Sequence, residues 1–434
     1  MSTALLTDRY ELTMIDAAIA SGRHERESVF EVFSRRLPEG RRYGIVAGTG
    51  RLLDAIENFR FTDAELGWLR DNSVVTDSTL DWLANYRFRG TLLGYQEGEV
   101  YFPGSPVLVV EGTFAEAVIL ETLTLSVLNY DSAVASAAAR MVAAADERPL
   151  AEMGSRRASE QSAVAAARAA YIAGFTASSN LEAGRRWGIP TMGTAAHAFT
   201  LLHDTEEEAF RAQVAALGSG TTLLVDTYDV TAAVDLAVRV AGPELGAVRI
   251  DSGDLPSQVA AVRTQLDSLG ATSTRITVTN DLDEFTIAAL RAAPVDSYGV
   301  GTSVVTGSGH PASGMVYKLV SRRGDDGEWL DVAKRSTAKA TVAGRKFPVR
   351  TLSDGVATAE SIHVVDPDDT APVEVTTGRA LLVPLITDGV IDERYRGAPG
   401  TALARAHRAA SVAELPISAF RLSKGEPAIP TVYV

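Results

Sequence analysis

Apolar and polar positions follow a repeated order in the middle of the chain. Between about 188 and 305, each short apolar run ends in polar residues and glycines, and a stretch of helix-forming residues follows. The runs occupy 189–197, 223–229, 248–254, 276–280 and 298–302, and their polar tips recur every 22 to 29 residues (279 to 301, 197 to 226). Strands that recur at this interval, with helices between them, predict βα units and a parallel sheet.

Units of this kind close into a (β/α) barrel or form an open, doubly wound sheet, and we favour the barrel. In a barrel, functional groups lie at the carboxyl ends of the strands, because the following loops converge on one face. The polar residues of this chain stand at those ends. We therefore expect an α/β fold with a barrel-like domain over 115–344. A second α/β domain is expected from the N-terminal segment, 1–114, together with the C-terminal segment, 345–434.

Helical patterns also appear outside the repeated region. Residues 63–70 have helical apolar spacing, with Thr62 as the expected N-cap. A long helix-forming stretch covers 115–145 and is expected to be interrupted near 129–132. Further helices are predicted over 158–184 and near 399–413.

Composition excludes several classes of function. The chain has 434 residues, 46% hydrophobic and 22% charged, which is typical of a globular protein. A net charge of −14 argues against general affinity for nucleic acid. The absence of cysteine excludes disulfides and thiolate chemistry. Neither a signal peptide nor an apolar run of membrane length is present, so we expect no membrane association and a cytoplasmic location.

The lysines are distributed unevenly. The chain has only five, and four of them, Lys318, Lys334, Lys339 and Lys346, fall within one short stretch. An acidic protein that binds phosphates needs a local basic region of this kind.

Arg156 and Arg157 follow a glycine directly before an alanine-rich helical stretch. A guanidinium group offers a planar fork for a phosphate or a carboxylate, and a helix N-terminus adds partial positive charge. A solvated arginine pair is the alternative interpretation in a chain this rich in arginine.

His197 stands at the end of a predicted strand, among small residues. Asp226, at the next strand end, could orient its imidazole and so leave a neutral ring nitrogen available as base or nucleophile. The alternative is a core histidine that is hydrogen-bonded to the backbone.

Residues 249–254 read Arg-Ile-Asp-Ser-Gly-Asp. Asp251 and Asp254 are suited to ribose hydroxyls or Mg²⁺, and Ser252 lies between them. Arg249 alternates with Asp251 along the strand, so both side chains should point to the same side. An ordinary turn would explain the same residues.

Gly299, Gly301 and Thr302 follow another apolar run, where backbone N–H groups of a tight loop could face a phosphate. A simple strand-to-helix turn is the alternative. The Walker, GxSxG and HExxH motifs are absent. Together, the candidate residues favour a phosphorylated ribose as ligand.

The chain resembles the nicotinate phosphoribosyltransferases, which belong to the type II phosphoribosyltransferase family. The resemblance is carried by residues 6–14, 121–129, 154–158, 193–197, 226–229, 249–254, 299–303 and 334–350, in the family's order. The barrel with a split second domain is also the architecture of that family.

The resemblance implies an ATP-hydrolysing, ligase-type enzyme of NAD biosynthesis. Nicotinate attacks the anomeric carbon of phosphoribosyl pyrophosphate, giving nicotinate mononucleotide and pyrophosphate. His197 matches the histidine that ATP phosphorylates, Asp226 would orient it, and Mg²⁺ is the expected cofactor, with its ligands unassigned. ATP is a co-substrate that leaves as ADP and phosphate.

The same resemblance assigns substrate contacts. Arg156 would contact a phosphate or the pyridine carboxylate, Arg249 the phosphates, and Asp251 the ribose hydroxyls. Tyr10 matches an aromatic residue that reaches into the neighbouring subunit's site, which implies a homodimer with shared active sites. The remaining implied substrate-binding residues are Ser179, Ser252, Asp254 and, around the 5′-phosphate, Gly299, Gly301 and Thr302.

Two positions depart from the nicotinamide-using relatives. Met153 stands where they carry a stacking aromatic residue, and Ser179 stands where they carry an acidic residue that reads the amide, so the neutral side chain favours nicotinate. The family's basic residue in the helix over 129–140 is also missing, with Ser136 and Ala137 at that place. Nicotinamide or quinolinate transfer on the same scaffold, or a sensor that binds nucleotides without turnover, are the alternatives.

Overall fold

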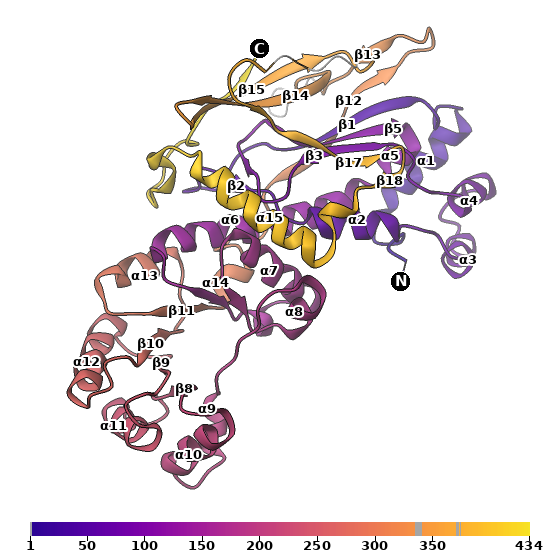
Figure 1. The fold of residues 1–434 in the computed structure, drawn as a ribbon. Helices are drawn as coiled ribbons and strands as arrows, with labels where there is room; N and C mark the ends of the chain where they lie inside the picture. Colours follow the sequence, from indigo (N-terminus) through magenta and orange to yellow (C-terminus); the bar gives the residue numbers. More distant parts are fainter. Residues whose placement is uncertain (1, 335–340, 370–372, 374) are drawn as a thin grey trace. The chain divides into compact units, whose positions relative to one another are not determined.

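The computed structural model describes residues 2–334, 341–369, 373 and 375–434. They form two compact units (Figure 1). The first unit contains the residues up to Ser136 and those from His310 onward, and the second unit is Ala137–Gly309. The expected boundaries, near 115 and 345, lie outside those of the second unit. The difference arises because β12 (Met315–Arg323) pairs with β1 (Glu27–Ser34) of the first unit.

The second unit is built on six parallel strands, in the order β7-β6-β11-β10-β9-β8. The first strand of the unit therefore pairs with the last, and the other strands follow the chain order around the sheet. This cyclic order is that of a barrel, whereas a doubly wound sheet reverses its order. The strands are β6 (Leu150–Glu152), β7 (Ala177–Ser178), β8 (Thr222–Leu224), β9 (Ala247–Ile250), β10 (Arg275–Val278) and β11 (Ser297–Val300).

The sheet continues beyond β7 through a single bridge. Ser178 pairs in parallel with Thr191, and among the described residues no pairing joins Thr191 to β8. The strand expected over 189–197 is thus reduced to one bridge. The α/β fold with a parallel sheet is confirmed, and the strand ladder of the described chain is open at this one position.

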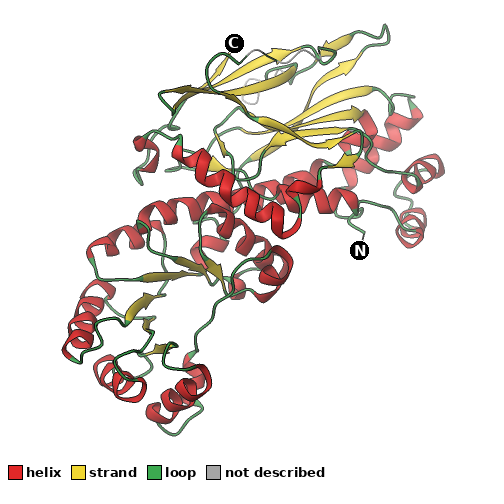
Figure 2. Cartoon of the chain, in the orientation of Figure 1, coloured by secondary structure: helices red, strands yellow, loops and turns green. Residues whose placement is uncertain are grey.

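Helices cover the outside of the second unit's strands (Figure 2). Side-chain caps fix several of their starts: Asn180, Thr205 and Asp229 each accept a hydrogen bond from the first turn of the helix that follows. The helices are α7 (Glu160–Ala173), α8 (Leu181–Trp187), α9 (His197–Leu201), α10 (Glu206–Leu217), α11 (Val230–Ala241), α12 (Leu255–Ser268), α13 (Glu284–Ala289) and α14 (Thr302–Val305), with short 3₁₀ turns at Ser155–Arg157 and Leu290–Ala292.

The first unit contains a seven-stranded sheet, β13-β12-β1-β5-β3-β17-β18, a four-stranded sheet, β16-β14-β15-β19, and the pair β2-β4. Its core packs apolar side chains of β1, β3 and β5 against the helices. Its remaining strands are β2 (Gly44–Ile45), β3 (Thr91–Tyr95), β4 (Val100–Tyr101), β5 (Pro106–Thr113), β13 (Trp329–Asp331), β14 (Arg345–Ser353), β15 (Val356–Val365), β16 (Arg379–Ala380), β17 (Leu382–Thr387), β18 (Val390–Ile391) and β19 (Thr431–Tyr433). Its helices are α1 (Arg9–Ala20), α2 (Thr49–Glu57), α3 (Asp63–Asp71), α4 (Asp77–Ala84), α5 (Phe114–Val118) and α15 (Gly397–Ala413), with 3₁₀ turns at Glu393–Tyr395 and Ile417–Phe420.

Thr62 caps α3 as expected and forms a full capping box with Glu65. The interruption expected near 129–132 is wrong, because α6 runs unbroken over Glu121–Ala145. Its polar side chains have tertiary partners: Asn129 bonds both backbone groups of Met315. The helix therefore accommodates them without a break.

The lysine-rich stretch does not form one basic surface. Lys346 is buried, and its ammonium group donates to both oxygens of Glu31, at 2.8 and 2.9 Å. Burial raises the pKa of Glu31 to about 7 although Lys346 lowers it. Lys318 is half-buried near Glu121, Lys334 is exposed, and Lys339 lies outside the described residues. At least one of these lysines therefore has a structural role.

No helix in the described part of the chain is long and apolar enough to cross a membrane.

Candidate active site at the carboxyl ends of the parallel strands

Every candidate residue except Tyr10 lies in the second unit. Most are on a strand or in the loop after its carboxyl end, whereas His197 begins α9. Asp226 follows β8, Arg249 is in β9, Asp251 and Ser252 follow β9, and Gly301 follows β11. Loops at these ends converge on one face of a barrel-type sheet. The structure thus places residues from distant parts of the sequence on one edge.

Asp226 organises the loop after β9. Its side chain is 1% exposed, and its Oδ2 accepts the backbone N–H of Asp251, at 2.8 Å, and the hydroxyl of Ser252, at 2.7 Å. Its other oxygen, Oδ1, is buried and has no hydrogen-bond partner in the described chain. A buried carboxylate oxygen without a donor is costly, so this atom is suited to a cationic ligand.

His197 is the first residue of α9, and its side chain is 40% exposed. Its Nδ1 lies 3.1 Å from the hydroxyl oxygen of Thr227. Its Nε2 lies 3.9 Å from Asp226 Oδ1 and 3.8 Å from Asp251 Oδ2, which is ion-pair distance rather than hydrogen-bond distance. Thr227 therefore orients the ring, and the two carboxylates stand beside the free nitrogen.

Arg249 is held rigidly. Its Nε donates to Thr279 Oγ1 at 2.9 Å and its Nη1 to Thr194 Oγ1 at 2.8 Å, while Nη2 lies 3.3 Å from Asp251 Oδ1. Thr279 in turn donates to Asp251 Oδ1 at 2.5 Å. The side chains of Arg249 and Asp251 therefore lie on the same side, as their alternation along the strand predicts.

Arg156 and Ser179 follow the adjacent strands β6 and β7. Both are exposed, and within the described residues the guanidinium of Arg156 has no hydrogen-bond or ion-pair partner. The main chain of Ser179 extends the ladder, because its N–H donates to the carbonyl oxygen of Glu152 at 2.8 Å. An exposed guanidinium without a partner can receive a carboxylate or a phosphate.

Close packing explains the glycines at the end of β11. A Cβ at Gly299 would lie 2.7 Å from Met153 Sδ and 2.7 Å from Thr279 Cγ2. Gly301 is less crowded, and Thr302, the first residue of α14, is exposed. Gly299 therefore brings β11 against both neighbouring strand ends.

Asp254 and Tyr10 stand apart from these contacts. Asp254 precedes α12 and accepts the hydroxyl of Ser257 at 2.6 Å. Tyr10 lies on α1 of the first unit and is 46% exposed. Burial of part of its ring, together with the charge of Glu121, raises its pKa to about 12, so the phenol is neutral at physiological pH.

Mg²⁺ usually binds through one or two carboxylates together with substrate phosphates and water. Within the described residues no three His, Asp or Glu side chains form a complete metal site. The unpaired Oδ1 of Asp226 and the nearby Asp251 nevertheless fit an ion that also binds a substrate phosphate.

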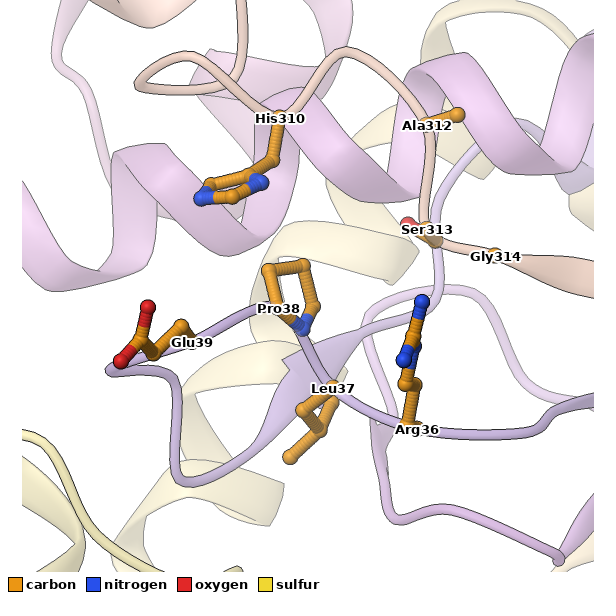
Figure 3. Close-up of a pocket in the computed structure, with 8 residues that line it drawn as sticks. All are labelled: Arg36, Leu37, Pro38, Glu39, His310, Ala312, Ser313 and Gly314. Atoms are coloured by element: carbon orange, nitrogen blue, oxygen red, sulfur yellow. The ribbon is translucent and has the colours of Figure 1, made fainter.

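A separate pocket of about 560 Å³ lies in the first unit (Figure 3). The side chains of Arg36 and His310 extend toward it from the loops after β1 and before β12. Glu39 at its rim pairs with Lys424 at 2.6 Å. No residue singled out from the sequence lines this pocket.

The sequence interpretation missed four residues that hold the site together: Thr194, Thr227, Thr279 and Glu152. The three threonines orient the predicted arginine and histidine. In the sequence, Thr279 stands out only as a polar residue at the end of an apolar run. Their position after strands was the one available signal.

Known proteins resemble this chain over both compact units. Residues 5–129 match the family described as nicotinate phosphoribosyltransferase (NAPRTase) N-terminal domain. A nicotinate phosphoribosyltransferase of Mycobacterium tuberculosis is 56% identical over 98% of this chain and 94% of its own length. One of Bacillus subtilis is 37% identical over 84% of this chain and 76% of its own length. The crystal structure of human nicotinic acid phosphoribosyltransferase superposes with a TM-score of 0.82 and 27% identity, covering 99% of this chain and 97% of the human one.

Proposed function

The chain belongs to the nicotinate phosphoribosyltransferase family, and we propose that it transfers phosphoribose from phosphoribosyl pyrophosphate to nicotinate. The products are nicotinate mononucleotide and pyrophosphate, and the reaction is coupled to hydrolysis of ATP. The observation that carries the proposal is the exposed imidazole of His197 beside Asp226, Asp251 and the anchored Arg249. Such a reaction serves NAD biosynthesis, and we propose a cytoplasmic location for it.

His197 is proposed as the phosphoryl acceptor. With its proton on Nδ1, the ring donates to Thr227 and leaves the Nε2 lone pair free. Nε2 bonds to the γ-phosphorus of ATP as the bond to the β–γ bridging oxygen breaks, and ADP leaves. Water later cleaves the N–P bond and releases phosphate. The carboxylates of Asp226 and Asp251, 3.9 and 3.8 Å away, stabilise the positive ring formed in between.

Transfer of the ribose is proposed to depend on position and charge. The pyridine nitrogen bonds to the anomeric carbon as the carbon–oxygen bond to pyrophosphate breaks, through an oxocarbenium-like transition state. Asp251 accepts hydrogen bonds from the ribose hydroxyls and Arg249 binds phosphate oxygens. Both side chains are already fixed by Thr279, so little reorganisation is needed during the reaction. The loop from Gly299 to Thr302 is assigned to the 5′-phosphate.

Mg²⁺ would be held by Asp226 and Asp251 together with substrate phosphates. When bound, it would neutralise charge on the pyrophosphate. The other residues assigned to substrate, Ser252 and Asp254, stand on the same loop after β9.

The identity of the pyridine substrate is tested by measuring mononucleotide formation with nicotinate, nicotinamide and quinolinate in turn, each with phosphoribosyl pyrophosphate and ATP. We expect efficient turnover with nicotinate alone. Comparable kcat/KM for nicotinamide would contradict the proposed selectivity, and absence of any product with nicotinate would contradict the function itself.

Ser179→Asp should lower the selectivity for nicotinate. The exposed serine stands one strand from Arg156, and a carboxylate there would repel the carboxylate of the substrate. Desolvated like-charge contacts cost several kcal/mol, so kcat/KM for nicotinate should fall by about 100-fold or more, while that for nicotinamide should change less. Ser179→Asn, which has the same shape without the charge, is the matched control. Equal losses with both acceptors would contradict the assigned role.

Tyr10 is proposed to complete the active site of a second copy in a homodimer. It is a neutral, partly exposed aromatic side chain, and among the described residues no other aromatic ring packs against it. Such a ring can stack on a pyridine.

Subunit mixing tests this sharing. We expect Tyr10→Ala and Asp251→Asn each to be nearly inactive alone. After unfolding and refolding as an equal mixture, half the dimers are mixed and each has one intact site, so about a quarter of wild-type activity should return. Tyr10→Phe should keep activity. A mixture no more active than its components would show that the sites are not shared.

A further inference from the structure

Glu152, the last residue of β6, is buried directly behind the residues assigned to the pyridine substrate. We propose that Glu152 is a positioning residue that determines nicotinate affinity, because its carboxylate closes a hydrogen-bonded ring between the loops after β6 and β7. This inference rests on the proposed function. It adds a residue that the substrate does not touch.

The ring consists of four hydrogen bonds among five residues. The Glu152 carboxylate accepts the Gly154 N–H at 2.5 Å through Oε1 and the Ser178 hydroxyl at 2.6 Å through Oε2. Ser178 Oγ accepts the Asn180 N–H at 2.9 Å, and Asn180 Nδ2 donates to Ser155 Oγ at 3.0 Å. Since Ser155 follows Gly154 in the chain, the ring is closed.

The chemistry of the ring requires two acceptor oxygens on Glu152. The Gly154 N–H can only donate. Ser178 already accepts from Asn180, so its own proton needs an acceptor as well. Glu152 is 0% exposed, and in the described chain neither an arginine, a lysine nor a histidine pairs with it. Burial raises the pKa of Glu152, while Ser178 and the Gly154 N–H oppose the increase. Burying a carboxylate here costs free energy unless it accepts the hydrogen bonds of these two donors.

The residues assigned to the substrate are attached to this ring. Arg156 follows Ser155, and Ser179 lies between Ser178 and Asn180. Both are exposed, so their positions depend on the backbone behind them. The ring also fits tightly against α14, because a Cβ at Gly154 would lie 2.2 Å from Val305 Cγ1 and 2.9 Å from the Gly301 carbonyl oxygen. A change in the ring therefore displaces Arg156 and Ser179, the residues assigned to the pyridine substrate, before it affects the rest of the site.

Glu152→Gln tests the inference. The amide keeps the size of the side chain but has only one acceptor oxygen. Its NH₂ group therefore faces either the Gly154 N–H or the Ser178 hydroxyl, and that hydrogen bond of the ring is lost. We expect the KM for nicotinate to rise by about ten- to a hundredfold, since small displacements of positioning groups have effects of this size. The KM for phosphoribosyl pyrophosphate should rise less. Asp296→Asn is the matched control: Asp296 also accepts a backbone N–H, that of Ile276 at 2.7 Å, but at the amino end of β10. It should leave both KM values unchanged.

A purely structural role would lower kcat through loss of folded enzyme and leave KM unchanged. An unchanged KM for nicotinate, or equal increases for both substrates, would overturn the inference. If Glu152→Gln does not fold, Ser178→Ala decides, because it removes one donor of the ring and should raise the KM for nicotinate several-fold. Wild-type enzyme without activity on nicotinate would instead contradict the proposed function.

Discussion

Replacing His197 with alanine should abolish ATP hydrolysis and the stimulation by ATP, while a slow transfer without ATP remains. The reason is that Nε2 is the proposed phosphoryl acceptor and that alanine presents no nucleophile beside Asp226 and Asp251. Removing a catalytic nucleophile costs several orders of magnitude in rate, about 10⁴-fold or more. ADP release and mononucleotide formation, each measured with and without ATP, report the two activities separately.

His203 provides the control for this variant. It lies six residues further along the chain, and its Nδ1 contacts the Phe199 carbonyl oxygen at 2.9 Å, outside the group around Asp226. His203→Ala should keep ATP coupling. If His197→Ala hydrolysed ATP at the wild-type rate in step with transfer, the assigned nucleophile would be wrong.

Asp251→Asn should nearly abolish phosphoribosyl transfer with or without ATP. The carboxylate lies 3.3 Å from Arg249, accepts from Thr279 at 2.5 Å and stands 3.8 Å from His197. The amide has the same shape but loses the charge that stabilises the oxocarbenium-like ribose and the charged imidazole. A single preorganised electrostatic contact contributes about 10²- to 10³-fold to rate, and we expect kcat to fall by at least this factor.

The measurement compares kcat and thermal unfolding of Asp251→Asn with those of Asp267→Asn. Asp267 pairs with Arg263 on the exposed side of α12, so Asp267→Asn should leave kcat unchanged. A loss of activity accompanied by an equal loss of folded protein in the first variant would indicate a structural role. A kcat near the wild-type value would remove Asp251 from the mechanism.

The spacing of apolar runs predicted the parallel sheet because each βα unit is local in sequence. It could not predict the pairing of β6 with β11, which joins residues about 150 positions apart. The strand expected over 189–197 was lost for a related reason: apolar content alone does not supply a neighbouring strand to pair with. Within the part of the chain that the structure describes, Thr191 alone of 189–197 pairs with a strand residue, Ser178.

The partners of buried polar side chains were the part of the structure that the sequence predicted least. The sequence suggested a break in α6 near Asn129, yet this side chain bonds Met315, 186 residues further along the chain. Lys346 belongs to the lysine-rich stretch of the sequence, whereas its partner, Glu31, is more than 300 residues away. Glu152 belongs to no sequence motif, and its partner Ser178 comes beside it only through the pairing of β6 with β7.

The most direct test of the account is to locate the phosphoryl group. Enzyme incubated with γ-labelled ATP is quenched in alkali, digested and mapped by mass spectrometry. We predict an acid-labile, alkali-stable phosphate on the peptide that contains His197, and its absence from His197→Ala. Label on a different residue, or ADP formation by an enzyme that never becomes labelled, would contradict the mechanism.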